Sequence, residues 1–356
     1  MRSLKNKSVF ITGVCGTIGK VLVKQLLSEE YGIRELIGID NDETGLFFLK
    51  QKYQNNHNAN FFVMDIRDRD ALINKIQNVD YIFHLAALKH VAICEESPDQ
   101  AIKTNILGTQ NIIDAANYND VEVVLFTSSD KAVNPTNVMG TSKLMGERII
   151  TGANSNKRKG GPIFASTRFG NVLGSNGSVI PIFYNQIKNS TPVTLTDPKM
   201  TRFVMTVQQA TELVINSSLI AKGGEVFVTK MLVMSIENLA HSMIEILSKS
   251  LGLPKVDIKN IGTKPGEKLY EELMSHEEIR RTIEHKNYYI ILPAFRGIYN
   301  AIEYTYKDIV NERPSQVYTS EQQEKLSIDQ IKTFLQENKL LVEPSEKTSF
   351  RSWPGG

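Results

Sequence analysis

Residues that can do chemistry are concentrated between Thr127 and Lys143, in the stretch TSSDKAVNPTNVMGTSK. This stretch follows an apolar run and contains hydroxyl groups, a carboxyl group and two amines. A carboxyl and an amine held side by side can act as a general acid and a general base. Asp130 and Lys131 form such a pair, although the same two residues would also suit a salt bridge in a surface loop.

Lys143 follows Met139 by four residues, a spacing that brings both side chains to one face of a helix. We predict that helix over residues 137–150, with Thr136 or Asn137 as its N-cap. A thioether has no titratable proton, so Met139 can be neither acid nor base. Taken alone, Met139 is interpreted as a packing residue.

The elements that must position these residues form a regular alternation of short apolar runs and helical patterns. This alternation predicts the fold class α/β, a Rossmann-like doubly wound parallel sheet, in which ligands bind beyond the carboxyl ends of the strands. The predicted strands end at Thr12, Asp40, Asp65, Ala87 and Ser129, and a sixth runs from Gly161 toward Val172.

A glycine-rich loop lies between the first strand and the first helix, with the spacing GxxGxxG. Such a loop lets the backbone approach a pyrophosphate, which the helix N-terminus attracts. Asp40, at the end of the second strand, would accept hydrogen bonds from ribose hydroxyls and repel a 2′-phosphate. NAD is therefore favoured over NADP, although a nearby cation such as Lys50 could reverse this. The predicted cofactor-binding residues are Gly13, Gly16, Thr17, Ile18, Gly19, Asp40, Asp65, Ile66, Ala86, Ala87 and Lys143. Asp65 would serve equally well as a helix N-cap.

The alternation loosens after Gly174, which indicates a smaller C-terminal α/β lobe. We predict an N-terminal NAD-binding domain over residues 1–173, to which later segments can return. The second lobe is predicted over residues 174–342 and a mobile tail over residues 343–356.

Composition excludes several classes of function. The 41 basic and 39 acidic residues give a net charge of +2, so nothing indicates binding to nucleic acid or to a membrane surface. The two cysteines form no disulfide framework and no metal-binding motif, and no apolar window is long enough to span a bilayer. A cytoplasmic location is expected.

Seven motifs together carry a resemblance that covers residues 6–275: TGVCGTIG, HLAALKHV, TNILGTQN, SSDKAVNPTNVMGTSK, RFGNVLGSNGSVIPIF, TRFVMT and PGEKLYEEL. In these motifs the chain resembles the extended short-chain dehydrogenase/reductase superfamily. Within it, the chain is similar to the UDP-N-acetylglucosamine 4,6-dehydratases of polysaccharide biosynthesis. A resemblance of this kind implies a tightly bound NAD that is recycled in each turnover.

The resemblance also implies roles for the residues of the opening stretch. Asp130 would be the elimination acid and Lys131 the base, while Ser129, or alternatively Ser128, would bind the C4 oxygen. Lys143 would hold the nicotinamide ribose, and Met139 occupies the position of the superfamily's tyrosine. This exchange is typical of a branch that retains configuration at C5 and resembles the catalytic domain of long membrane-anchored members. Without the tyrosine, the C4 hydroxyl proton could pass to Asp130, to Lys131, or through a water to Lys143.

The substrate implied by the resemblance is a UDP-sugar, with a GDP-sugar as the alternative, and a homo-oligomer is expected. Alternative functions are a 4-epimerase or reductase on the same fold, or a sugar-nucleotide-binding protein without activity. The predicted substrate-binding residues are Lys89, Asn171, Ser178, Val179, Thr194 and Arg202.

Overall fold

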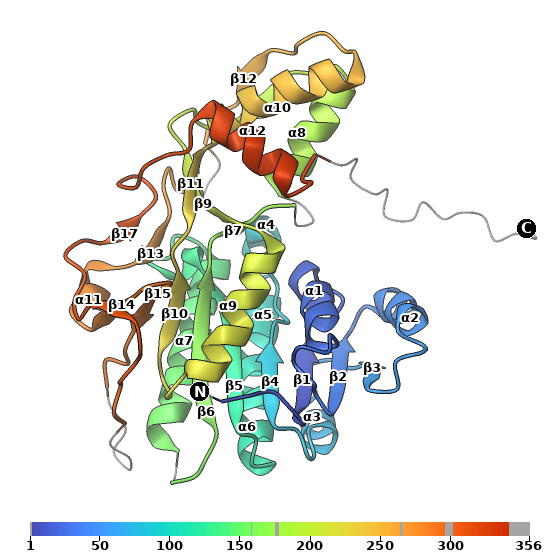
Figure 1. Ribbon diagram of the computed structural model, residues 1–356, viewed down its shortest axis with the longest axis vertical. Coiled ribbons are helices and arrows are strands. Elements are labelled where there is room, and N and C mark those ends of the chain that lie inside the picture. Colours follow the sequence, from blue (N-terminus) through green and yellow to red (C-terminus); the bar gives the residue numbers. More distant parts are fainter. Residues whose placement is uncertain (1, 158, 175–177, 264–265, 296–301, 342–356) are drawn as a thin grey trace, which may run out of the picture. The chain divides into compact units, whose positions relative to one another are not determined.

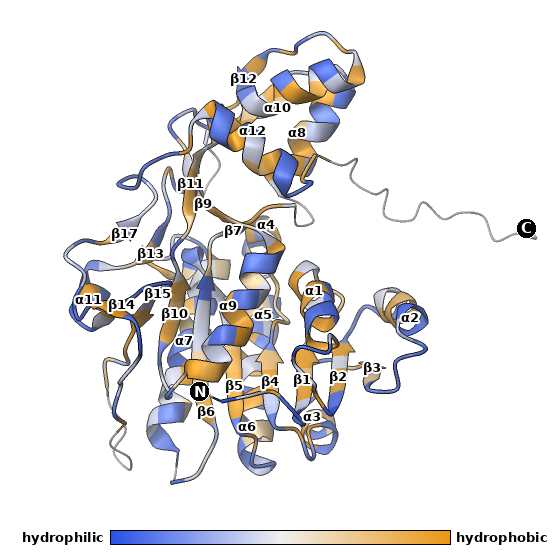
Figure 2. Cartoon of the chain, in the orientation of Figure 1, coloured by the Kyte–Doolittle hydropathy of each residue, from blue (hydrophilic) through white to orange (hydrophobic). Residues whose placement is uncertain are grey.

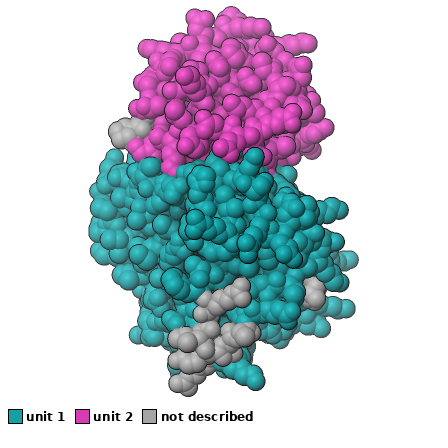
Figure 3. Space-filling view, turned by 90° about the vertical axis from the view of Figure 1, so that its left-hand side faces the viewer, with its two compact units in different colours: residues 1–170, 208–230, 272–319 teal, residues 171–207, 231–271, 320–356 magenta. Residues whose placement is uncertain are grey.

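The computed structural model describes residues 2–157, 159–174, 178–263, 266–295 and 302–341 (Figure 1). The predicted tail, residues 343–356, lies outside these ranges. The chain divides into two compact units, each made of three separate pieces (Figure 3). Unit 1 comprises residues 1–170, 208–230 and 272–319, and unit 2 comprises residues 171–207, 231–271 and 320–356.

Unit 1 is built on a ten-stranded sheet with the order β16-β14-β15-β10-β6-β5-β4-β1-β2-β3. The strands from β3 to β10 are parallel, and β15, β14 and β16 add an antiparallel edge. The order 3-2-1-4-5-6 is that of a doubly wound dinucleotide-binding fold, as predicted. The strands are β1 (Ser8–Thr12), β2 (Glu35–Asp40), β3 (Ala59–Val63), β4 (Tyr81–His84), β5 (Val123–Ser129), β6 (Ile163–Phe169), β10 (Val226–Thr229), β14 (Thr282–His285), β15 (Tyr288–Ile291) and β16 (Ile309–Asn311).

Helices cover both faces of this sheet (Figure 1). One face packs against α3, α6 and α7 through an apolar core that includes Phe10, Ile82, Ile112, Phe126 and Phe164. The central strands are strongly apolar, as expected for parallel strands buried on both faces (Figure 2). The helices of unit 1 are α1 (Thr17–Leu26), α2 (Glu43–Lys52), α3 (Arg69–Lys75), α4 (Val91–Glu96), α5 (Pro98–Ala101), the π-helix η1 (Ile102–Leu107), α6 (Gly108–Tyr118), the 3₁₀ turn η2 (Asp130–Ala132), α7 (Val138–Asn156), α9 (Val207–Ile220) and α11 (His276–Ile279). A small pair of strands, β13 (Glu272–Met274) and β17 (Tyr318–Thr319), completes it.

Several bounds differ from the prediction. Strands β3 and β4 end two and three residues earlier than predicted, at Val63 and His84. Helix α7 continues six residues beyond its predicted end at Ile150, to Asn156. Strand β10 and helix α9, predicted in the C-terminal lobe, belong to unit 1, because β10 pairs with β6 in the large sheet. Unit 1 thus includes two later segments, residues 208–230 and 272–319.

Unit 2 packs three helices around its own apolar core. Its members include Phe183, Met234, Leu239, Met243 and Ile331. The elements are β7 (Asn171–Val172), α8 (Val179–Lys188), β8 (Val193–Leu195), β9 (Thr201–Met205), β11 (Leu232–Ser235), α10 (Ile236–Leu251), β12 (Ile258–Asn260) and α12 (Ile328–Glu337). Strands β11, β9 and β7 form one small sheet, and β12 pairs with β8 in another.

Candidate active site

Strand β5 ends in the turn that carries the predicted acid and base. Asp130 is 1% exposed, and its Oδ1 accepts hydrogen bonds from Ser129 Oγ at 2.7 Å and from Lys131 Nζ at 3.0 Å. Its Oδ2 is buried and has no hydrogen-bond partner among the described residues. A buried carboxylate oxygen without a donor is costly, so this atom marks a place where a ligand hydroxyl would be stabilising.

The two serines before Asp130 differ in their hydrogen bonding. Ser129 Oγ donates to Asp130 and accepts from the Lys131 backbone N–H at 3.3 Å. Ser128 is buried, and its hydroxyl has no partner within the described part of the chain. Only Ser129 is thus coupled to the carboxyl group of Asp130.

Helix α7 brings Lys143 beside the end of β5. The helix begins after Asn137, whose side chain accepts a hydrogen bond from the Gly140 N–H at 2.8 Å, as the prediction of an N-cap required. A Cβ at Gly140 would collide with the carbonyl of Lys131, so glycine allows the helix to approach the turn closely. Lys143 Nζ donates to the carbonyl of Thr127 at 2.9 Å and lies 4.9 Å from the Phe126 ring centre.

Burial lowers the pKa of Lys143 to about 8, an effect that the negative charge of Glu147 opposes. The surroundings of Lys143 therefore destabilise the charged form of its side chain.

Met139 lies in an apolar cluster with Cys94 and Ala101, against Leu88 and Val91. Its side chain is 4% exposed. The surroundings are those of a packing residue, in keeping with a flexible and apolar thioether.

A buried histidine, which the sequence analysis did not single out, joins three elements beneath the site. Thr12 Oγ1 accepts from the backbone N–H groups of Leu85 and Ala86, each at 3.1 Å, so its own proton goes to His84 Nδ1 at 2.7 Å. His84 Nε2–H then donates to Thr109 Oγ1 at 3.1 Å. This assigns a neutral Nε2–H tautomer, and burial lowers the pKa of His84 to about 3.

Asn105, in the π-helix η1, holds the segment after β4 in place. Its side-chain amide bonds both the N–H and the carbonyl of Leu88, at 2.8 and 3.0 Å, and donates to Ser142 Oγ at 2.8 Å. Lys89, a predicted substrate residue, follows directly and is exposed. A π-helix in this position is a common feature of functional sites, but its sequence signal is weak.

The glycine loop has the geometry that a pyrophosphate requires. Gly13 has φ +71°, and a Cβ there would lie 2.8 Å from the Ala86 N, so the loop and the end of β4 pack backbone to backbone. Helix α1 begins at Thr17 after Gly16, and no side chain caps it. The first N–H groups of α1, including those of Thr17 and Ile18, are therefore available to an anion.

Asp40 is fixed by the same loop. Its Oδ2 accepts from the Cys15 N–H at 2.8 Å and its Oδ1 from the Asp42 N–H at 3.1 Å. Two more acidic residues lie close by in the sequence, Asp42 as the N-cap of α2 and Glu43 as its first residue. These residues suit ribose hydroxyls and disfavour a further phosphate, so the loop and Asp40 fit NAD.

Asp65 and Ile66 follow β3. The Asp65 carboxylate is engaged by the guanidinium of Arg67, at 2.9 and 3.0 Å from Nε, and this hydrogen bonding lowers the pKa of Asp65. Ile66 is buried against Gly108. The helix N-cap is Asp68, whose side chain accepts from the Ala71 N–H, so the alternative role of Asp65 as N-cap is wrong.

The guanidinium of Arg168, at the end of β6, forms a second buried cluster that the sequence analysis did not predict. Arg168 is 1% exposed and pairs with Glu147 of α7 and with Glu278 of α11. In the sequence, Arg168 belongs to a motif interpreted as a substrate loop. Its pairing with Glu278 could not be recognised, because Glu278 lies 110 residues away.

Unit 2 carries the remaining predicted substrate residues. Asn171 lies in β7, opposite Val204 of β9. Ser178 precedes α8, whose first residue is Val179; its Oγ is buried, caps no N–H and has no partner among the described residues. The start of α8 is therefore open to an anion such as a diphosphate. Thr194, in β8, is bonded to the Gln186 side chain at 2.8 Å.

Arg202 was predicted to bind a phosphate, and its contacts disagree with that role. Its guanidinium donates to the carbonyls of Thr201, Lys268 and Leu269 at 2.8 to 3.2 Å and lies 3.5 Å from Glu271. The residue is 8% exposed. Arg202 holds two chain segments of unit 2 together, and this satisfies most of its donors.

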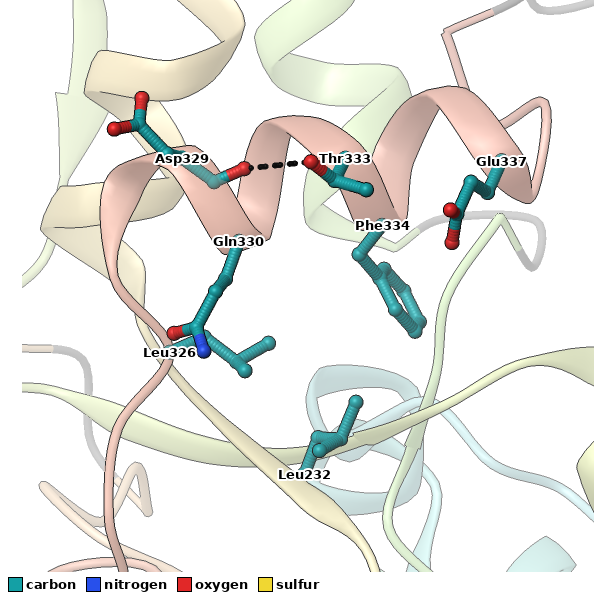
Figure 4. A pocket seen from close by; sticks show the side chains of 7 residues that line it. All are labelled: Leu232, Leu326, Asp329, Gln330, Thr333, Phe334 and Glu337. Carbon is teal, nitrogen blue, oxygen red and sulfur yellow. Dashed lines mark hydrogen bonds between the residues drawn. The ribbon is translucent and has the colours of Figure 1, made fainter.

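A cavity of about 360 Å³ lies in unit 2 between β11 and α12, lined by apolar Leu232, Leu326 and Phe334 with acidic residues at its rim (Figure 4). It contains none of the predicted site residues. Within the described ranges, no cluster of residues could hold a metal ion, and no helix is both long and apolar enough to cross a membrane.

Comparison with known proteins identifies relatives over most of the chain. The family described as "Polysaccharide biosynthesis protein" matches residues 9–293. An uncharacterized membrane protein of Methanocaldococcus jannaschii is 45% identical over 81% of this chain and 86% of its own length. The inverting UDP-N-acetylglucosamine 4,6-dehydratase of Campylobacter jejuni is 37% identical over 82% of this chain and 84% of its own length.

Two further similarities cover almost the whole chain. The UDP-glucose 4-epimerase of Rickettsia rickettsii is 35% identical over 93% of this chain and 95% of its own length. The X-ray structure of Pen from Bacillus thuringiensis is 40% identical, with a TM-score of 0.88, and the match covers 95% of this chain and 99% of that one.

Proposed function

The chain belongs to the family of polysaccharide biosynthesis proteins, and from this premise we propose that it is an NAD-dependent nucleotide-sugar 4,6-dehydratase. The proposed substrate is UDP-N-acetylglucosamine. The product would be a UDP-4-keto-6-deoxy-N-acetylhexosamine for polysaccharide or surface glycan synthesis. The similarity to a UDP-N-acetylglucosamine 4,6-dehydratase supports both assignments.

One observation carries the proposal: the buried Asp130 carboxyl beside Lys131, with one oxygen left for a ligand. Removing water across C5 and C6 needs an acid for the departing C6 hydroxyl and a base for the C5 proton. An epimerase or a reductase needs only hydride and proton transfer at C4. A carboxyl and an amine on adjacent residues at the end of β5 suit the elimination.

Proton transfer at C4 is also supported by the arrangement of Ser129 and Asp130. The C4 hydroxyl can donate to Ser129 Oγ or directly to Asp130 Oδ2, and either route delivers its proton to Asp130. Asp130 then holds the proton that the departing C6 hydroxyl requires. Lys131, in its neutral form, takes the C5 proton and returns it to C5. Lys143, directed at Thr127, is placed less well to receive the C4 proton.

The fit of the glycine loop and Asp40 to NAD supports the choice of cofactor. Bound there, NAD would supply the hydride chemistry between C4 and C6 and would be recycled in each turnover. Lys143 would hold the nicotinamide ribose. Lys89, Asn171, Ser178, Val179 and Thr194 remain proposed substrate contacts. Arg202 is left out of this set, because its guanidinium binds backbone carbonyls of the chain.

The test is incubation with UDP-N-acetylglucosamine and no added cofactor. A product lighter by one water, found by mass spectrometry, supports the dehydratase. An unchanged mass with full binding would rule out the dehydratase and leave an epimerase or a protein that only binds sugar nucleotides. Parallel reactions with a GDP-sugar test the choice of nucleotide, and proton NMR of the product tests retention at C5.

A 4-epimerase is the second candidate, favoured by the similarity to proteins named UDP-glucose 4-epimerase. It predicts a product of unchanged mass and inverted configuration at C4. The mass of the product separates the two, because an epimerase removes no water from its substrate.

A further inference from the structure

The cluster of Arg168, Glu147 and Glu278 is a buried set of charges that the proposed function leaves unused. All three side chains are at most 5% exposed. Each of the five N–H groups of the guanidinium has an acceptor. Nε and one NH2 proton go to Glu147 at 2.8 and 2.7 Å. The other NH2 proton and one NH1 proton go to Glu278 at 2.7 and 2.9 Å, and the last goes to the Leu273 carbonyl at 3.0 Å.

The hydrogen bonds between Arg168 and Glu147 fix α7 against β6. A guanidinium is planar and rigid, so two-pronged bonding to Glu147 sets both the height and the rotation of the helix that carries it. Lys143 lies one turn earlier on the same helix, and its Nζ reaches the carbonyl of Thr127. A shift of α7 along β6 would break that contact.

The two carboxylates of the cluster have different surroundings. Glu278 also lies 3.8 Å from the guanidinium of Arg281, whereas among the described residues Glu147 has an ion pair with Arg168 only. Buried charge of one sign is stabilised by a nearby charge of the other sign. Lys143, 6% exposed, is the cation on the same face of α7.

We propose that the Arg168–Glu147–Glu278 cluster is a positioning device for Lys143. It holds the Glu147 carboxylate one turn beyond Lys143 on α7, where the negative charge of Glu147 favours the charged form of the buried ammonium group. The link from Lys143 to the nicotinamide ribose rests on the proposed function. The electrostatic coupling does not.

The other groups around Lys143 cannot take over this role. Cys94 of α4 favours the charged form less than Glu147 does. His84 of β4 is neutral, because its buried ring is held as the Nε2–H tautomer. Asp130 and Lys131, in η2, form an ion pair with each other. Burial lowers the pKa of Lys143 to about 8 even with Glu147 in place, so removal of Glu147 must lower this pKa further.

The experiment compares Glu147→Gln with Glu278→Gln. Each variant removes one negative charge from the same guanidinium, but only Glu147 shares the helix with Lys143. The readout is the titration of Lys143, followed by NMR in protein labelled with ¹³C at lysine Cε. The signal is assigned with Lys143→Met, and neither cofactor nor substrate is needed. We expect E147Q to lower the midpoint by about one pH unit or more, and E278Q to lower it by less than half as much.

Equal shifts in the two variants, or no shift in E147Q, would overturn the proposal. If E147Q does not fold alone, the double variant K143M/E147Q decides. E278Q disturbs two contacts of Arg168, as E147Q does, and measures that loss of stability by itself. The proposal requires the double variant to be as stable as E278Q, because no buried ammonium is then left without its anion, and a lower stability counts against the proposal. Because the titration uses no substrate, it can succeed even if the proposed reaction is wrong.

Discussion

Asn134 Nδ2 lies 3.1 Å from both carboxylate oxygens of Glu272, 138 residues further along the chain. Asn134 has φ +44°, a left-handed backbone conformation that asparagine tolerates better than most residues do. The contact joins β13 to the loop that follows Asp130 and Lys131. The loop is thus anchored by a segment from the C-terminal part of unit 1.

The first prediction separates the backbone of Asn134 from its side chain. Asn134→Ala should be less stable than Asn134→Gly by about 1 kcal/mol, since glycine adopts the left-handed conformation without strain. Urea unfolding of the two variants measures this difference. Both variants lose the contact to Glu272, so their turnover should fall by a similar factor. Equal stability of the two would show that the backbone conformation carries no cost.

Asp130→Asn should abolish most activity without unfolding the protein. General acid–base groups contribute roughly 10²- to 10⁴-fold to rate, and an amide cannot transfer the proton. Stability should not fall, because the amide oxygen can still accept from Ser129 and Lys131. Turnover and urea unfolding are measured on the same preparation, with Asp70→Asn as control, since the Asp70 side chain is 90% exposed. Full activity in D130N would remove the basis of the proposed elimination.

The pH dependence of stability should report Lys143. Its pKa is about 8 in the folded protein and 10.5 when unperturbed, so the unfolded chain binds the extra proton between these values. Stability therefore rises with pH across this window, by an amount on the order of 3 kcal/mol. Lys143→Met should lack this rise. Lys157, whose pKa burial also lowers to about 8, is present in both proteins and cancels in the comparison.

Below pH 6.5, the pH dependence of stability should report His84. Its pKa is about 3 in the folded state and 6.5 when unperturbed, so the unfolded chain binds a proton as pH falls below 6.5. The wild type should lose roughly 2 kcal/mol between pH 6.5 and 5 through this residue. His84→Gln can still offer one acceptor and one donor to Thr12 and Thr109. If H84Q keeps the same slope as the wild type, His84 is not the group responsible.

Cys15 should resist alkylation despite its place in the glycine loop. Burial, together with the charge of Asp40, raises the pKa of its thiol to about 12. At pH 8 the fraction of Cys15 present as thiolate should be roughly 10³-fold lower than for an unperturbed thiol. The rate of reaction with iodoacetamide should fall by the same factor. Peptide mass spectrometry of native protein gives the rate, with urea-unfolded protein as the reference. Rapid labelling of the native protein would contradict this environment.

The parallel sheet was predictable because its strands are short apolar runs with clear ends. β1 and β2 were predicted with the bounds that the structure has, and Asn137 was identified as an N-cap. Local patterns suffice for such features, since the apolar period and the caps lie within a few residues of one another.

Contacts between distant residues could not be predicted in this way. Arg168 reads as part of a loop motif, yet it is buried by Glu278, and Arg202 reads as a phosphate ligand, yet it binds carbonyls near residue 268. Both arginines bind segments that lie many residues further along the chain. His84 was overlooked for a related reason, because its partners Thr12 and Thr109 come from separate elements.

The distance in sequence between Arg168 and Glu278 also sets an order of events during synthesis. The 110 residues between them take about 5 to 20 s to translate, and over that time the guanidinium has only one of its two carboxylates. The central parallel strands can pair in the meantime, since the antiparallel strands made last are added at the edge. The nascent chain therefore forms its sheet before it can lock α7, and a ribosome stalled before residue 278 would hold a protein with its glycine loop assembled but Lys143 not yet secured.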